Sequence, residues 1–438
     1  MRGRLGKWQL LTLALLLAGA AGGSSYLFFP SSAASPIADR LTFGAFGAFP
    51  APDLASLLGQ GNDSDSSDAP LPAPVVTATA QGSAARHKPA AKHSARPTAT
   101  ATAAAGGTAD AAGLGLYDGQ SSPSGIETAA SWLGSSSSIK YAQDFVDATD
   151  WSHISNPWQL SNWQGSPFSM VWGVPMLPCG SSATQCSTNV SDYDEVANGG
   201  ADSYFKTLAQ NLISAGFGSS YIRLGWEFNA TWMGWSICNS DGSGLASWAS
   251  DFVPAFQNIV TSMRSVSGAN FKFIWNPIDS SNASCSGANL ENFYPGDNYV
   301  DVVALDTYDG IGATTSDADR WTDLLNGVGD GGWTAETPAA ISGQGFQGYG
   351  MNWLAAFGKE HAKEVGLPEW GLDSSGQDGG GGDDSYFMTQ MANWIKTYAT
   401  GPAIYWNYSG GTLPLDIPNY TDGGTPDASA VFKAAFSS

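Results

Sequence analysis

The sequence predicts an α/β protein whose main domain, residues 113–438, is a (β/α)8 TIM barrel. Short β-rich runs alternate with helical patterns through this region, and there are eight such runs. Polar and aromatic residues follow most of the runs, at the strand ends where the active sites of such barrels lie. The alternative is a doubly wound open sheet, which would want a glycine-rich phosphate turn after the first run. LYDGQSSPSG, at 116–125, lacks the GxGxxG spacing, so the barrel is favoured.

Each predicted strand is a run rich in β-branched, aromatic or leucine residues and too short for a helix. Between several of the strands, apolar residues recur at helical spacing instead. The predicted strands are 114–119, 141–147, 169–177, 219–229, 271–277, 301–308, 367–372 and 403–408. The predicted helices are 194–216, 245–266, 351–366 and 428–436, the last of which would close the barrel.

The first 112 residues are predicted to lie outside the barrel. Residues 1–30 join a basic start to a short apolar stretch, which is typical of a secretory signal peptide, with an uncleaved membrane anchor as the alternative. Residues 31–112 are rich in Ala, Pro, Thr and Ser without periodicity, which predicts a disordered linker. We therefore expect a secreted or extracellular protein, either free or tethered to membrane or cell wall. His87 and His93 are interpreted as solvated linker residues.

The net charge of the predicted barrel limits the kinds of molecule that it could bind. From residue 113 onward there are 10 Lys and Arg against 33 Asp and Glu, a net charge of −23. This excess argues against nucleic acid, an anionic membrane surface or an anionic polymer, because each needs positive charge on the protein. We expect a monomer that binds a neutral ligand and needs no cofactor or metal.

Four cysteines and the expected export make disulfides plausible. The pairing Cys179–Cys186 with Cys238–Cys285 is favoured among three connectivities, because the first two cysteines share one short loop. No CxxC motif is present, which argues against a zinc site or thioredoxin-like chemistry.

The segment YIRLGWEFNATWMGW, residues 221–235, places Glu227 among aromatic side chains at the end of the fourth predicted strand. A carboxyl group in apolar surroundings is unfavourable unless its pKa shifts or it finds a partner. Glu369 ends the seventh strand on the opposite side of the barrel, so the two carboxyls are expected to face each other across its mouth. The other polar or aromatic residues at strand ends are Arg223, Trp226, Asn229, Trp275, Asn276, Asp306, Tyr308, Trp370 and Trp406.

Two facing carboxyls are what glycoside hydrolysis needs. One protonates the leaving oxygen, and the other attacks the anomeric carbon or activates water. Aromatic rings around them supply stacking faces for sugars and an apolar wall that keeps the acid protonated near neutrality. The sequence therefore predicts a glycosidase with Glu227 as the acid.

At this point the residues resemble a known family. RLGWEFNATWMGW is similar to the acid/base motif of glycoside hydrolase family 26, in which an arginine precedes H-E-x-N and two spaced tryptophans. NFYPGDNYVDVVALDTYDG (292–310) and LPEWGL (367–372) resemble the family's segments at strands six and seven. The resemblance covers roughly residues 113–438 and implies a (β/α)8 barrel and a retaining endo-β-glycosidase of β-mannanase type.

The resemblance also implies residue roles. Glu227 corresponds to the acid/base and Glu369 to the nucleophile, with Tyr308 as a hydrogen-bond donor to the nucleophile. Trp232 and Trp235 correspond to the aromatic pair that lines the sugar cleft, and Asn229 to the asparagine two residues beyond the acid/base. The other residues expected to contact substrate come from the strand ends rather than from the resemblance: Arg223, Trp226, Trp275, Asp306, Trp370 and Trp406. Trp226 stands where the family has a histidine, which leaves the glycan open between β-1,4-mannan, β-1,3-xylan and mixed-linkage β-glucan.

Structural interpretations compete with each role. Glu227 and Arg223 lie on one face of a strand and would suit a buried ion pair. Arg223 would also suit a structural role, orienting a carboxylate at the barrel mouth. Asp309 and Asp373 are substitutes for Glu369, and Tyr308 would also suit a core position. The loop 377–386 is interpreted as a mobile rim segment rather than a calcium site. Two other functions are considered. A carbohydrate-binding barrel without activity would keep the tryptophan cleft but would not need both carboxyls, whereas a cell-surface transglycosylase shares every residue named above.

Overall fold

The computed structural model describes residues 113–134, 138–180, 189–280, 285, 288–310, 316–328, 338, 341, 343–374, 380–408, 412–417 and 424–437. The predictions of a signal segment and a linker fall on residues 1–112 and lie outside this range. Among the described helices, none combines the length and apolar character needed to cross a membrane.

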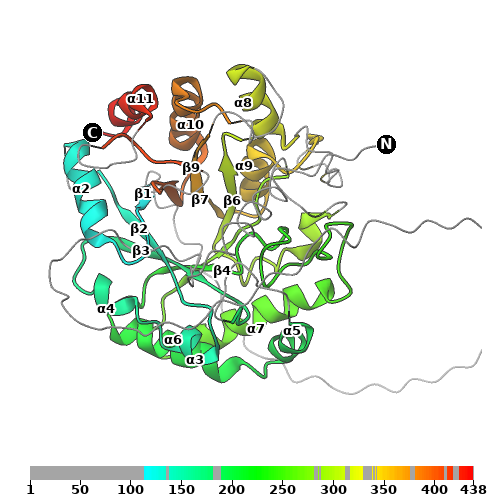
Figure 1. Ribbon diagram of the computed structural model, residues 1–438. Helices are drawn as coiled ribbons and strands as arrows, with labels where there is room; N and C mark the ends of the chain where they lie inside the picture. Colours follow the sequence, from blue (N-terminus) through cyan, green and yellow to red (C-terminus); the bar gives the residue numbers. More distant parts are fainter. Residues whose placement is uncertain are drawn as a thin grey trace, which may run out of the picture. The chain divides into compact units, whose positions relative to one another are not determined.

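Eight parallel strands form a closed barrel, which confirms the predicted fold (Figure 1). Each strand pairs with its sequence neighbours, and β1 pairs with β8 to close the cylinder. A short strand, β9 (Thr412–Leu413), adds to β7 in antiparallel orientation. The barrel strands are β1 (Gly113–Tyr117), β2 (Tyr141–Phe145), β3 (Ser169–Val174), β4 (Tyr221–Leu224), β5 (Lys272–Trp275), β6 (Val302–Tyr308), β7 (Glu364–Asp373) and β8 (Pro402–Trp406).

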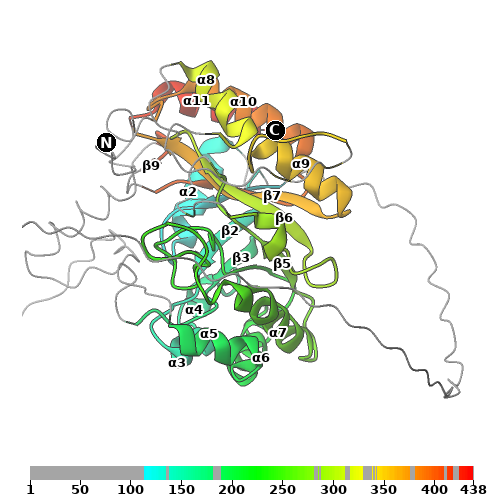
Figure 2. The same ribbon diagram turned by 90° about the vertical axis from the view of Figure 1, so that its right-hand side faces the viewer.

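Helices surround the strands on the outside of the barrel, as the two perpendicular views show (Figures 1 and 2). Their apolar faces pack on the outward side chains of the strands in one continuous core. The helices are α2 (Pro123–Leu133), α3 (Trp151–Ser155), α4 (Leu160–Trp163), α5 (Val190–Ala197), α6 (Asp202–Ser214), α7 (Phe252–Arg264), α8 (Asp317–Asn326), α9 (Met351–Glu360), α10 (Ser385–Tyr398) and α11 (Pro426–Phe436), with 3-10 turns η3 (Ala249–Asp251) and η4 (Leu290–Phe293).

The predicted helix 194–216 is two helices, α5 and α6. The break falls where Gly199 takes a left-handed backbone (φ 80°) and Gly200 follows it. Glycine lowers helix stability by about 1 kcal/mol relative to alanine, and two in succession favour a stop. The predicted helix 351–366 also ends early, at Glu360, because Ala362 takes a left-handed backbone (φ 51°) and residues 364–366 begin β7.

The disulfide Cys238–Cys285 is present and confirms half of the predicted pairing, with the two Cα atoms 5.4 Å apart. It links the loop after β4 to the loop after β5. In the other predicted pair, Cys179–Cys186, Cys186 lies outside the described residues.

Candidate active site

The site begins where β4 ends. The predicted strand 219–229 stops at Leu224, and the chain then turns through Gly225 (φ 54°) and Glu227 (φ 49°). A left-handed backbone costs a residue other than glycine about 1–2 kcal/mol. The turn is held because the Glu227 N–H donates to the carbonyl of Asn276 (2.8 Å). The backbone strain therefore serves to aim the Glu227 side chain across the barrel mouth.

Asn229 fixes the same turn from the other side. Its amide N–H donates to the carbonyl of Ile278 (2.8 Å), and its amide oxygen accepts from the Ile278 N–H (2.9 Å). The side chain is buried, and this pairing uses both ends of the amide. Asn229 is thus a structural clamp, and a contact between Asn229 and substrate stays a prediction.

Strands β6 and β7 bring the second and third carboxyls together. Asp306 and Glu369 are register partners on these neighbouring strands. Tyr308 lies two residues beyond Asp306 and therefore on the same face. Its hydroxyl donates to Oε1 of Glu369 (2.7 Å), which is the contact that the sequence led us to expect.

Arg223 joins these groups from beneath. Its guanidinium donates to Oε2 of Glu369 (2.7 Å), to Asp306 and to the side-chain oxygen of Asn276. The side chain has no exposed surface, and the neighbouring carboxylates raise its pKa. Arg223 therefore orients carboxylates, which confirms its structural interpretation, and its burial leaves no exposed face for the alternative, a contact with sugar.

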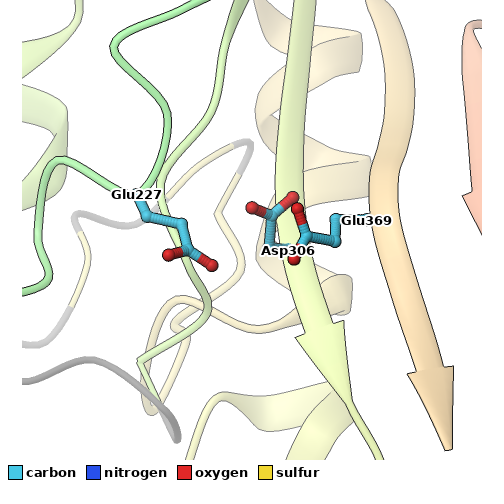
Figure 3. A group of neighbouring side chains, drawn as sticks. All are labelled: Glu227, Asp306 and Glu369. Carbon is cyan, nitrogen blue, oxygen red and sulfur yellow. The ribbon is translucent and has the colours of Figure 1, made fainter. Parts of the chain in front are cut away.

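Glu227, Asp306 and Glu369 converge in the mouth of the barrel (Figure 3). One carboxyl oxygen from each lies within 4.8 Å of the others. All three are buried. Among the described residues this group could also approach a metal ion, but Arg223 already brings a positive charge to two of its members. The donor set therefore suits proton chemistry on a neutral ligand better than cation binding.

The environment of Glu227 favours the protonated acid. Burial and the nearby charge of Glu369 raise its pKa to about 7, against the opposing effects of Arg223 and of the Trp232 indole. Burial likewise raises the pKa of Asp306 well above its usual range, although Arg223 opposes this. The raised pKa of Glu227 suits a group that donates a proton near neutral pH.

Aromatic rings line one side of this group. Trp406 is half-buried and stacks on Tyr117, with ring centroids 4.1 Å apart. Phe145 packs against Trp226 and Trp406 at 5.0 and 5.9 Å. Trp232, also half-buried, donates its indole N–H to Oε2 of Glu227 (2.8 Å). Sequence reasoning did not single out Tyr117 or Phe145, whose positions at the ends of β1 and β2 were the signal available.

Three tryptophans do not have the expected role. Trp275 and Trp370 have no exposed surface and point outward from the barrel, where Trp275 packs on Phe357 and Trp370 packs on Phe432. Neither can stack on a sugar at the mouth. Trp235 is also buried, and its indole N–H donates to the carbonyl of Trp226 (2.6 Å), so it supports the aromatic wall from behind.

The loop after β7 is partly described, because residues 375–379 lie outside the described range. The described residues of the loop are held by ion pairs and hydrogen bonds, and the mobility of the rim stays a prediction. Arg320, from α8, pairs with Asp309 (3.0 Å) and Asp384 (2.6 Å), and the Gly381 N–H donates to Asp309 (3.0 Å). Asp384 also caps α10. Asp309 is thus part of an ion network, which argues against it as a substitute for Glu369.

A hollow of about 640 Å³ lies at the opposite end of the barrel. It is lined by residues at the starts of strands, among them Tyr141, Ser169, Tyr221 and Lys272. None of the three carboxyls lines it, and the N-terminal ends of barrel strands are typically structural. The candidate site therefore remains the mouth.

Comparison with known families now adds to this geometry. Residues 90–328, more than half of the chain, match Glycosyl hydrolase family 26. The chain belongs to glycosyl hydrolase family 26. The match contains Glu227, Asp306 and Tyr308, whereas Glu369 lies beyond its end. The pairing of β6 with β7, in which Asp306 and Glu369 are partners, places Glu369 beside the matched residues.

Individual relatives of this family 26 chain are distant. Endoglucanase H of Acetivibrio thermocellus is 31% identical over 127 residues, which are 29% of this chain and 13% of that protein's length. A modular endo-β-1,4-mannanase from Cellulomonas fimi is 14% identical over 73% of this chain and 70% of its own, with a TM-score of 0.47. A β-mannanase from Bacteroides ovatus is 16% identical over 75% of this chain and 88% of its own, with a TM-score of 0.47.

Proposed function

We propose that this family 26 chain is a retaining endo-β-glycosidase acting on a neutral β-linked polysaccharide. The observation that carries the proposal is the approach of Glu227 and Glu369, whose nearest carboxyl oxygens lie within 4.8 Å. Retaining enzymes hold their carboxyls about 5–5.5 Å apart, whereas inverting enzymes need about 6.5–9.5 Å to admit a water molecule. The short separation supports direct attack by one carboxylate.

In the first step, Glu369 attacks the anomeric carbon while Glu227 gives its proton to the glycosidic oxygen. The carbon–oxygen bond breaks, its electron pair stays on the leaving sugar, and a glycosyl ester of Glu369 forms. Arg223 and the Tyr308 hydroxyl each bind one oxygen of Glu369, so they hold the carboxylate for this attack.

In the second step, Glu227 is a carboxylate and takes a proton from water. The resulting hydroxide attacks the anomeric carbon, and the bond to Glu369 breaks, which restores both groups. Asp306 does not need to exchange a proton in either step, because its place is beside Arg223 under the nucleophile.

The glycan is proposed from charge and aromatic content. A strongly acidic barrel disfavours a polyanion, and stacked aromatics such as Trp406 and Tyr117 suit a neutral sugar ring. The relative named as an endoglucanase and the replacement of the family histidine by Trp226 favour a β-glucan, while β-mannan is the substrate that the family resemblance implies. We also propose export through residues 1–30.

Release of reducing ends from neutral polysaccharides tests the function directly. The panel should hold β-1,4-mannan, β-1,3-xylan and mixed-linkage β-glucan, with Glu227→Gln assayed beside the wild type. Turnover of one glycan that is lost in the variant would identify the substrate and the acid together. Binding of a glycan by a folded wild type without any turnover would instead favour the carbohydrate-binding barrel.

The activity is expected to fall above about pH 7, tenfold for each further pH unit, because the acid must carry its proton and its pKa lies near that value. The measurement is kcat/KM across about pH 4 to 9 with a folded-state control at each pH. The fall in kcat/KM above about pH 7 is the basic limb of the profile. In Glu227→Gln, assayed on an aryl glycoside whose leaving group needs no proton, this basic limb should disappear. A limb that persists in the variant would assign the titration to another group.

A further inference from the structure

We propose that Trp232 is the positioning residue for the acid proton of Glu227, holding Oε2 through its indole N–H so that the proton stays on Oε1. This inference rests on the proposed function, since it concerns the acid of the glycosidase. It differs from the expected role of Trp232 as a sugar-stacking platform, because the residue would act through the acid rather than on substrate.

The contact itself is short and directional. The indole nitrogen lies 2.8 Å from Oε2 of Glu227, which is an ordinary hydrogen-bond length. Indole nitrogen is a donor only, so this contact requires Oε2 to act as an acceptor. A protonated carboxyl has one O–H, and a proton on Oε2 would compete with the indole hydrogen. The acid form compatible with the contact therefore carries its proton on Oε1.

The loop that carries both residues is held rigidly. The Trp232 ring packs against a small apolar cluster of Ala230 and Ile278. Ile278 is itself clamped by the two hydrogen bonds of Asn229, and Cys238–Cys285 ties the loop to its neighbour further along. The ring is thus fixed by contacts that do not depend on Glu227, as a positioning donor requires.

The same bond serves both catalytic steps. In the first step, the proton leaves Oε1 for the glycosidic oxygen, and the new carboxylate keeps the indole bond at Oε2. In the second step, Oε1 accepts the proton of the attacking water. The indole N–H donates throughout, so no proton is gained or lost at Trp232.

Several charged groups face Glu227 besides the indole. Glu369 from β7 raises its pKa, and Arg223 from β4 lowers it. Asp306 and Tyr308 come from β6: the side chain of Asp306 hydrogen-bonds with Glu227 and lowers its pKa, and Tyr308 senses the charge of Glu227. A hydrogen bond to a carboxylate stabilises its charged form, so the indole lowers the pKa of Glu227 and its removal should raise it.

Trp232→Phe tests the idea, because it keeps an aromatic ring and removes the N–H. The basic limb of kcat/KM is expected to move upward by about one pH unit. Trp248→Phe is the matched control: it removes an indole N–H bond to the Ser236 carbonyl in the same loop, away from Glu227, and should leave the limb in place. A changed KM with an unmoved limb in Trp232→Phe would overturn the proposal and make Trp232 a platform.

Titration of the acid itself separates this inference from the proposed function. The whole chain has only eight glutamates, so ¹³C labelling of their carboxyls gives a spectrum simple enough to assign, with Glu227→Gln identifying the signal. The pKa of Glu227 should be higher in Trp232→Phe than in the wild type, whether or not a substrate has been found. An equal pKa in the two proteins would overturn the inference, while retained turnover in Glu227→Gln would overturn the proposed function alone.

Discussion

Glu369→Gln is expected to lower kcat/KM by about 10⁴-fold or more on every substrate, because it removes the group that attacks the anomeric carbon. The amide keeps the size of the side chain, so the loss is chemical rather than steric. Glu227→Gln should differ in kind. On an aryl glycoside with a strongly acidic phenol as leaving group, the departing oxygen needs no proton, and formation of the glycosyl-enzyme should be spared.

The leaving-group comparison therefore assigns the two roles. Glu364→Gln is a suitable control, since it makes the same change at the start of β7, beside Lys272 at the far end of the barrel. It should retain wild-type turnover. Proton NMR of the first sugar released should show the β anomer, as retention requires. If Glu369→Gln turned over the activated substrate and Glu227→Gln did not, the assignments would be reversed.

The second large effect concerns Arg223→Met. Breaking a buried ion pair by removing one partner costs about 3–5 kcal/mol, because the remaining charge is left without compensation. Here Asp306 and Glu369 would both lose their cation. For a domain of this size the expected fall in Tm is on the order of 5 °C at neutral pH. Thermal unfolding followed by calorimetry measures it.

The pH dependence of that loss gives the sharper test. Burial already raises the pKa of Asp306 in the wild type against the opposing charge of Arg223, so loss of Arg223 should raise it further and the folded variant should take up this proton at a higher pH than the wild type does. The difference in Tm between variant and wild type should therefore shrink as the pH falls. Arg264→Met is the control, because the pair Arg264–Asp301 is a third exposed and should contribute under about 1 kcal/mol. Equal losses at both sites would contradict the network described here.

The order of strands and helices could be predicted from the sequence because the two kinds of element differ in the periodicity of their apolar residues. All eight barrel strands fall within or beside the predicted runs. The two facing glutamates followed from strand order and from the rule that active sites lie at the carboxyl ends. One helix was split and several were missed, since short amphipathic segments such as α2 and α8 carry few apolar positions.

Which tryptophans face the mouth could not be read in the same way. A barrel strand is buried on both faces, so apolar residues occupy inward and outward positions alike and alternation disappears. In the sequence, Trp275 and Trp370 lie at the ends of predicted strands just as Trp406 does. Only the register of β5, β7 and β8 in the closed barrel turns the first two toward the helices and leaves the third half-buried at the mouth.

The sequence by itself determined the barrel, the two carboxyls and the aromatic character of the site. Those depend on local composition and on the order of elements along the chain. Tertiary structure alone decided that Arg223 lies beneath Asp306 and Glu369, that Asn229 clamps Ile278, and that the Trp232 indole meets Glu227. Such contacts join segments tens of residues apart, or they depend on the left-handed backbone of a residue such as Glu227. Their geometry exists only once the strands have closed.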